Sequence, residues 1–134
     1  MITGTGCDIA KISRFERWVH NKALTRRFFH PEELGILDRS PRQAAQSLAA
    51  RFAAKEAYSK ALGTGFHGLE LRDICVVTGG NGKPSLAVHK SALGLLQKNG
   101  ADTIHLSLSH DGDYALAFVI LEKTELEEKN DEIL

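Results

Sequence analysis

The chain has 134 residues, of which 43% are hydrophobic and 25% are charged, and its formal net charge at pH 7 is zero. This composition is typical of one globular domain with its own core, and the lack of a positive net charge argues against general nucleic-acid binding. No apolar run approaches the ~20 residues that span a bilayer, so no membrane partner is expected. Cys7 and Cys75 fit no metal-binding spacing, and residues 1–8 do not resemble a signal peptide, so we expect a cytoplasmic protein.

Charge is distributed unevenly along the chain. The segment 11–27 contains six basic residues and one acidic residue, whereas the segment 122–134 is mainly acidic. The basic residues are Lys11, Arg14, Arg17, Lys22, Arg26 and Arg27. They indicate either a solvated helix face or a docking surface for an acidic partner.

The N-terminal residues 2–12 are predicted to form a strand, with Ile2, Gly4, Gly6 and Asp8 on one face. Glycine is a poor choice inside a strand unless another element approaches the backbone closely. The pattern therefore predicts tight packing against this face. Asp8 then lies either in a site or at a strand end as a helix cap.

Two helices are predicted next in the chain. The first runs from Ser13, its expected N-cap, to about Phe29. The second is short and begins at Pro31, because proline is favoured in the first turn of a helix. Residues 39–41 end it.

The longest predicted helix begins after Pro41 and ends at Gly63, a typical C-terminal stop signal. Its alanines, together with Leu48 and Phe52, form one broad apolar arc. These small side chains would let a neighbouring element, such as the glycine-containing N-terminal strand, pack closely against the helix.

Four of the charged residues on this helix decide whether it contributes to a functional site. Glu56 and Lys60 fall inside the apolar arc, whereas Arg51 and Lys55 are expected on the opposite, solvated side. On an exposed face, a Glu–Lys pair at this spacing contributes only about 0.2–0.5 kcal/mol. In a buried arc each charge needs a partner or an ion. The helix alone leaves both interpretations open.

After this helix, residues 74–77 and 85–88 are expected to form a β-hairpin around the glycine-rich turn 79–82. Lys83 follows the turn and either flanks the hairpin or contacts a phosphate. A further helix is predicted from about Lys90 to Lys98.

The last predicted hairpin begins with residues 103–109, which alternate strictly between apolar and polar side chains. His105 and Ser107 share the polar face, His110 follows, and residues 114–120 return as an apolar strand. Such hydroxyl and imidazole groups either face water or bind phosphate oxygens. A hydrolase triad is not favoured, because there is no nucleophile elbow and no acid partner for the histidine.

Asp8 and Glu56 are carboxylates at positions where small or apolar residues would be expected. Mg²⁺ commonly takes one or two protein carboxylates together with water and substrate phosphates. Arg51, Lys55 and Lys60 could hold the same phosphates. Together these residues indicate attack on a phosphate ester or anhydride.

Five segments, in this order, are similar to those of the holo-[acyl-carrier-protein] synthases, the small single-domain class of 4'-phosphopantetheinyl transferases. They are residues 4–9 (GTGCDI), 52–57 (FAAKEA) with Lys60, 61–65 (ALGTG), 82–84 (GKP) and 105–110 (HLSLSH). The resemblance covers residues 1–122 and leaves 123–134 as an acidic tail. It implies an α+β fold, in which an antiparallel sheet packs against a long central helix and shorter helices.

The resemblance implies transfer of 4'-phosphopantetheine from coenzyme A to a serine of apo acyl carrier protein, releasing adenosine 3',5'-bisphosphate, in support of fatty acid biosynthesis. It implies Mg²⁺ held by Asp8 and Glu56, with Lys60 near the phosphates. The serine proton could leave through Glu56, Lys60 or a metal-bound water. A binding module that retains the coenzyme A pocket without chemistry, and a metal-dependent phosphohydrolase, are the alternatives.

The resemblance also implies a homotrimer with sites between subunits, so that the two carboxylates meet the Ser/His strand of a neighbour. The implied coenzyme A contacts are Arg51, Lys60, Gly63, Lys83, Pro84, His105, Ser107 and His110. The acidic carrier protein would dock on Arg14, with Arg17, Lys22, Arg26 and Arg27 as further docking residues.

Overall fold

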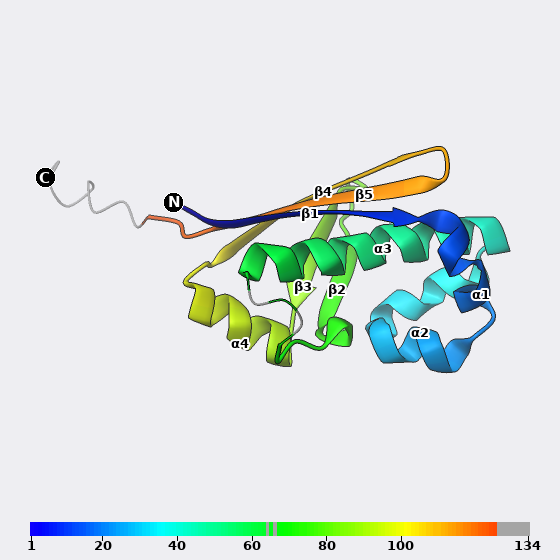
Figure 1. The fold of residues 1–134 in the computed structure, drawn as a ribbon, viewed down its shortest axis with the longest axis horizontal. Helices are drawn as coiled ribbons and strands as arrows, with labels where there is room; N and C mark the ends of the chain where they lie inside the picture. The colour runs from blue at the N-terminus through cyan, green and yellow to red at the C-terminus, as the bar shows by residue number, and fades with distance from the viewer. Residues whose placement is uncertain (64, 66, 126–134) are drawn as a thin grey trace, which may run out of the picture.

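The computed structural model describes residues 1–63, 65 and 67–125 (Figure 1). The elements are β1 (Ile2–Lys11), η1 (Ile12–Phe15), α1 (Glu16–Val19), α2 (Lys22–Phe28), η2 (Pro31–Asp38), α3 (Pro41–Leu62), η3 (Leu71–Asp73), β2 (Ile74–Thr78), β3 (Pro84–Val88), α4 (Lys90–Asn99), β4 (Thr103–Asp111) and β5 (Tyr114–Glu122). This α+β architecture agrees with the expected fold class. Within the described part of the chain, no helix combines the length and apolar character needed to cross a membrane.

A three-stranded antiparallel sheet in the order β1-β5-β4 runs along α3 (Figure 1). Alternate residues of β5, from Ala115 to Leu121, are buried and pack with the alanines of α3 in one core. The hairpin β2–β3 forms a second sheet, and its strand β3 lies next to β4. Both hairpins and α4 were predicted from the sequence.

Helix α3 has the predicted boundaries because both of its ends are capped. The Ser40 hydroxyl accepts a hydrogen bond from the Gln43 backbone N–H at 3.4 Å, and Pro41 occupies the first turn. At the other end Gly63 adopts φ = 76°, a left-handed conformation that glycine tolerates best.

Strand β1 approaches α3 unusually closely through its two glycines. A Cβ atom placed on Gly4 would lie 2.0 Å from the Ala61 carbonyl oxygen, and one on Gly6 would lie 1.9 Å from that of Ala57. Neither position can hold a larger residue without moving the strand from the helix. The tight packing predicted for this face is therefore confirmed. Ile2 is an exception, because a register shift between Ile2 and Gly4 leaves it exposed.

The prediction of one continuous helix from Ser13 to Phe29 is wrong. The chain forms the 3-10 turn η1 and two short helices, α1 and α2, and η1 has no side-chain cap within the described residues. The break falls at Asn21, whose side chain accepts a hydrogen bond from Leu24 N at 3.1 Å and starts α2. A side chain with this capping preference favours a new helix start over continuation.

The prediction that Lys55 is solvated is also wrong. Lys55 lies about 160° round the helix from Ala57, so it does point away from the sheet. This side of α3, however, is covered by η2 and β2, and Lys55 is fully buried. Its ammonium group donates to Glu33 Oε1 at 2.6 Å and to the Leu71 carbonyl at 3.0 Å.

Glu33 connects three elements around this buried lysine. Its carboxylate also accepts hydrogen bonds from His30 N at 2.9 Å and Val76 N at 3.2 Å. Burial lowers the pKa of Lys55, although the charge of Glu33 opposes this shift. The pair thus ties η2 and β2 to α3, and a helical wheel alone could not reveal it.

Candidate active site

Asp8, Glu56 and Lys60 come together where β1 passes α3. Lys60 Nζ donates to Asp8 Oδ1 at 2.9 Å and to the Cys7 carbonyl at 3.2 Å. The Lys60 side chain is 56% exposed and that of Asp8 is 18% exposed, so the pair lies at the surface. The sequence predicted that the close packing of β1 brings Asp8 to the charged residues of α3, and its hydrogen bond with Lys60 confirms this.

The electrostatics of this group favour an additional cation. Partial burial raises the pKa of Glu56, and the nearby charge of Asp8 raises it further, against the opposing effects of Lys60 and Arg14. The hydrogen bond and charge of Asp8 raise the pKa of Lys60, which therefore keeps its proton. The two carboxylates offer the oxygen ligands that Mg²⁺ prefers, whereas the protonated Lys60 cannot ligate a metal and provides positive charge beside them.

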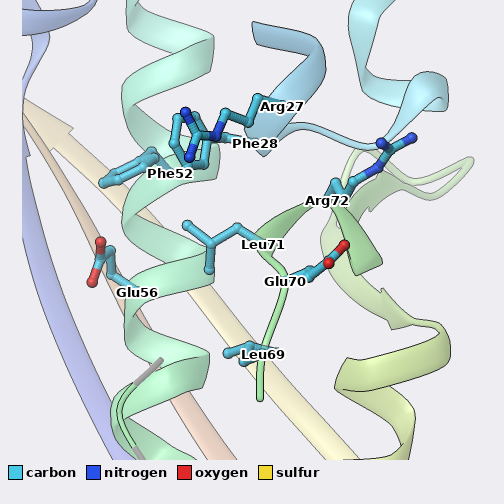
Figure 2. Close-up of a pocket in the computed structure, with 8 residues that line it drawn as sticks. All are labelled: Arg27, Phe28, Phe52, Glu56, Leu69, Glu70, Leu71 and Arg72. Carbon is cyan, nitrogen blue, oxygen red and sulfur yellow. The ribbon is translucent and has the colours of Figure 1, made fainter. Parts of the chain in front are cut away.

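A cavity of about 560 Å³ adjoins Glu56 (Figure 2). Its apolar lining comes from Phe28, Phe52, Leu69 and Leu71. The polar lining residues are Arg27, Glu56, Glu70 and Arg72. Such a cavity can accept a flexible, largely apolar chain next to a charged reaction centre.

The residues of segment 69–72 were missed by the sequence reasoning. They follow a glycine-containing loop, and four residues are too few for an alternating pattern to predict a strand or a site. The alternation of Leu69 and Leu71 with charged Glu70 and Arg72 was the available signal. The loop residues Thr64 and Phe66 lie outside the described residues.

The predicted coenzyme A contacts do not all gather in one place within a single chain. Lys83, Pro84 and His105 line a hollow of about 380 Å³ between β3 and β4. His110 lines a different hollow of about 830 Å³, beside Arg42. The remaining predicted contacts, Gly63 at the end of α3 and Ser107 on the outer sheet face, are exposed.

Arg51 has surroundings that differ from those predicted. Its side chain is only 14% exposed, and its Nε lies 3.8 Å from Glu33 Oε2. Among the described residues this Nε has no hydrogen-bond partner. Burial lowers the pKa of Arg51, and Glu33 opposes the shift. In one chain Arg51 thus belongs to the buried ionic group rather than to the carboxylate site.

The predicted docking residues are all exposed, and two of them flank the cavity. The Arg14 guanidinium lies 5.0 Å from the centre of the Phe52 ring, and that of Arg27 lies 5.4 Å from the centre of the Phe28 ring. Arg17, Lys22 and Arg26 complete the set, and the latter two line a separate small hollow. Positive charge therefore borders the entrance next to Glu56.

The outer face of the sheet, turned away from α3, is unusually apolar. Ile9, Leu116 and Phe118 are 61%, 39% and 41% exposed, and Tyr114 is 47% exposed. The register pairs Ile9 with Leu116 and Cys7 with Phe118, so these side chains form one continuous patch, named here the outer sheet patch. Contiguous exposed apolar surface of this kind marks an interaction site.

The fold and this site define a group-transfer domain of a known kind. Residues 4–119 match the family model of the 4'-phosphopantetheinyl transferase superfamily, and the chain belongs to this superfamily. Within it, the chain is 49% identical over 122 residues to a protein of Treponema denticola named holo-[acyl-carrier-protein] synthase, covering 91% of this chain and 99% of that one.

Solved structures give the same result. The holo-[acyl-carrier-protein] synthase of Neisseria meningitidis is 35% identical with a TM-score of 0.78, over 92% of this chain and 100% of that one. The Bacillus anthracis enzyme of this name, solved in complex with CoA (3',5'-ADP), is 33% identical with a TM-score of 0.77, over 92% and 99% of the two chains.

Proposed function

We propose that this chain transfers the 4'-phosphopantetheine group of coenzyme A to a serine hydroxyl of apo acyl carrier protein, in support of fatty acid biosynthesis. The observation that carries the proposal is the group Asp8, Lys60 and Glu56 beside an apolar cavity bordered by arginines. The named relatives are holo-[acyl-carrier-protein] synthases that align over nearly the whole chain. Cys7 is an exposed free thiol, which fits a reducing compartment such as the cytoplasm.

Mg²⁺ is the cofactor that the donor set fits. Asp8 and Glu56 would hold it with their carboxylate oxygens. Partial burial, and then the charge of Asp8, raise the pKa of Glu56, so a cation bound between the two carboxylates would stabilise the ionised form of Glu56. When bound, the ion would supply electrostatic stabilisation to the phosphoryl oxygens.

In the reaction, the serine oxygen forms a bond to the phosphorus that carries the pantetheine arm, and the anhydride bond to adenosine 3',5'-bisphosphate breaks. The serine proton must leave during this transfer. Lys60 already holds its proton firmly, so we assign it to charge neutralisation at the phosphates rather than to proton abstraction. Glu56 and a water molecule then remain as proton acceptors.

The cavity next to Glu56 fits the pantetheine arm. Phe28, Phe52 and Leu71 offer apolar contacts along its length, and the amide groups of the arm would face the polar rim. The acidic carrier protein would approach over Arg14 and Arg27, which puts its serine next to Glu56.

We further propose the homotrimer. The outer sheet patch is apolar and exposed, and a second copy of the chain would bury it against a surface of matching apolar character. Association would also bring the hollow of Lys83, Pro84 and His105, or that of His110, to the carboxylates of a neighbour. This explains why these residues are separated within one chain.

The reaction is tested by intact-mass measurement of apo acyl carrier protein incubated with coenzyme A, Mg²⁺ and the purified protein. The carrier protein should gain the mass of phosphopantetheine, and Asp8→Ala or Glu56→Ala should abolish the gain. Coenzyme A binding without product would favour a binding module. Release of free phosphopantetheine in the absence of carrier protein would favour a phosphohydrolase.

The subunit arrangement is tested by mixing two impaired variants. Asp8→Ala and His110→Ala would be unfolded and refolded together. If each site combines the two residues from different subunits, random assortment restores about a quarter of the sites. Mixed protein that stays as inactive as the separate variants would refute the shared site while leaving the transferase reaction itself untouched.

A further inference from the structure

We propose that His30, Glu32 and Cys75 form a binding site for a divalent cation of the Zn²⁺ type, separate from the Asp8–Glu56 pair. The three residues offer one nitrogen, one carboxylate oxygen and one sulfur atom, all within 4.8 Å of one another. His30 and Glu32 lie at the start of η2, whereas Cys75 lies on β2. A bound ion would therefore tie these two elements together.

The required movement is small. Zn²⁺ binds sulfur at about 2.3 Å and nitrogen or oxygen at about 2.0–2.2 Å, which places tetrahedral ligands roughly 3.5 Å apart. The cluster must contract by about 1 Å to reach this spacing. Glu32 is exposed and His30 is only partly buried, so both can move, whereas Cys75 is 1% exposed and acts as the fixed ligand.

A second histidine stands next to the cluster. The ring of His89 stacks on that of His30, with centroids 5.0 Å apart and planes inclined by 27°. His89 is exposed and precedes α4. Structural zinc sites usually have four protein ligands of the Cys and His kind, so His89 supplies a candidate for the fourth position.

The thiol of Cys75 makes only a weak polar contact with the described residues of the fold. Its Sγ lies 3.9 Å from the Val76 carbonyl, a weak contact. Burial raises the pKa of Cys75 to about 11, and the charge of Glu33 contributes to this. The thiol therefore carries a proton at neutral pH, and the ion must displace it.

The ligand types separate this site from the carboxylate site. Sulfur and imidazole ligands select Zn²⁺ and related transition metals, whereas Mg²⁺ prefers oxygen ligands throughout. The two sites should therefore fill independently. Excess Mg²⁺ should not displace an ion bound at Cys75.

His30 also has a role that needs no metal. Its Nδ1 accepts a hydrogen bond from Glu32 N at 3.1 Å, as part of a helix cap. Capping explains the histidine, but it does not require the thiol or the second ring nearby. Metal-binding measurements distinguish these two explanations.

The test is titration of chelator-treated protein with Co²⁺, which reports a thiolate ligand by a sulfur-to-metal charge-transfer band. Wild type should bind one equivalent with this band, and Zn²⁺ but not Mg²⁺ should remove it. Cys7→Ser, the matched cysteine control, and Asp8→Ala should behave as wild type. Cys75→Ser should lose the band.

Because Cys75 is buried, a surface variant provides a second measurement. Glu32→Ala should remain folded and should bind Co²⁺ about tenfold or more weakly. The absence of the band in wild type with excess Co²⁺, its persistence in Cys75→Ser, its loss in Cys7→Ser, or unchanged affinity in Glu32→Ala would each overturn the proposal. Transferase activity without added Zn²⁺ bears only on the proposed function, so the two failures are distinguishable.

Discussion

Gly6→Ala tests whether the close approach of β1 to α3 sets the active-site geometry. The added Cβ would lie 1.9 Å from the Ala57 carbonyl oxygen and 2.7 Å from Ala61 N. Non-bonded heavy atoms need about 3.5 Å, so the strand and helix must separate by roughly 1.5 Å. Both contacts are to backbone atoms, which cannot rotate away.

The expected loss of stability follows from this clash. Overpacking of a core typically costs about 1–3 kcal/mol, and a clash between backbones should reach the upper end, about 3 kcal/mol. For a chain of this length, such a loss lowers the midpoint of thermal unfolding by roughly 10 °C. The comparison must be made at equal protein concentration, because association contributes to stability.

The same displacement should also impair catalysis. Asp8 lies two residues further along β1, and its 2.9 Å contact with Lys60 would be broken. A misplacement of about 1 Å can cost about 100-fold in rate, so turnover should fall by this order at a temperature where both proteins are folded. Normal turnover and a melting point near that of wild type would refute the reasoning.

Gly94→Ala is the matched control for this substitution. Gly94 lies inside α4, and its added Cβ would meet no described atom within 4 Å. Alanine is favoured over glycine inside a helix by about 0.5–1 kcal/mol, so this variant should be slightly more stable than wild type and fully active. The same glycine-to-alanine change is thus expected to lower the stability at Gly6 and to raise it slightly at Gly94.

Three further predictions concern charge and association. Glu33→Gln should lower the free energy of unfolding, measured in urea, by about 3–5 kcal/mol, because it leaves Lys55 buried without a counter-charge. Glu33→Leu combined with Lys55→Met should recover only part of that loss, because the backbone N–H groups of His30 and Val76 then lose their acceptor; equal stability of the single and double variants would contradict this. Glu56→Gln should raise the melting temperature in chelator, because ionised Glu56 is partly buried next to Asp8. The difference should vanish at acidic pH, where the side chain at position 56 is uncharged in both proteins. Phe118→Glu should yield monomers in analytical ultracentrifugation, with loss of activity, and an active trimer would exclude the outer sheet patch as the interface.

Local sequence signals predicted most of the secondary structure. Ser40 and Gly63 mark both ends of α3 by their capping chemistry, and strict alternation sets the exposed face of β4 around His105 and Ser107. The contact between β1 and α3 could be inferred because Gly4 and Gly6 allow the strand to approach the helix more closely than any larger residue would. Each of these features depends on a few neighbouring residues.

Features that depend on tertiary packing could not be predicted in this way. A helical wheel assumes one buried side, but α3 is covered by the sheet on one side and by η2 and β2 on the other, so Lys55 was placed in solvent. The cavity-lining residues Leu69 and Leu71 lie in a segment whose alternation of apolar and charged residues is too short to predict a site. The Asp8–Lys60 pair joins residues 52 positions apart. The sequence predicted that Asp8 approaches the charged residues of α3, but it did not predict the hydrogen bond to Lys60.

The buried ion pair also explains how Glu56 is held in position. Lys55 and Glu56 are consecutive on α3, so they point about 100° apart, one to the Glu33 carboxylate and the other to the cavity. The glycine contacts fix the distance of α3 from the sheet, but they do not by themselves fix its rotation. A rotation of about 20° would move a side chain at a radius of 5–6 Å by roughly 2 Å, enough to displace Glu56 from Asp8. Lys55 and Glu33 oppose this, together with the buried Tyr58 hydrogen bond to the Ala92 carbonyl, because any such rotation separates two charges that have no access to water. Apolar replacements of similar volume can match such a pair in stability, so we infer that the pair serves to orient Glu56, the carboxylate proposed to hold Mg²⁺.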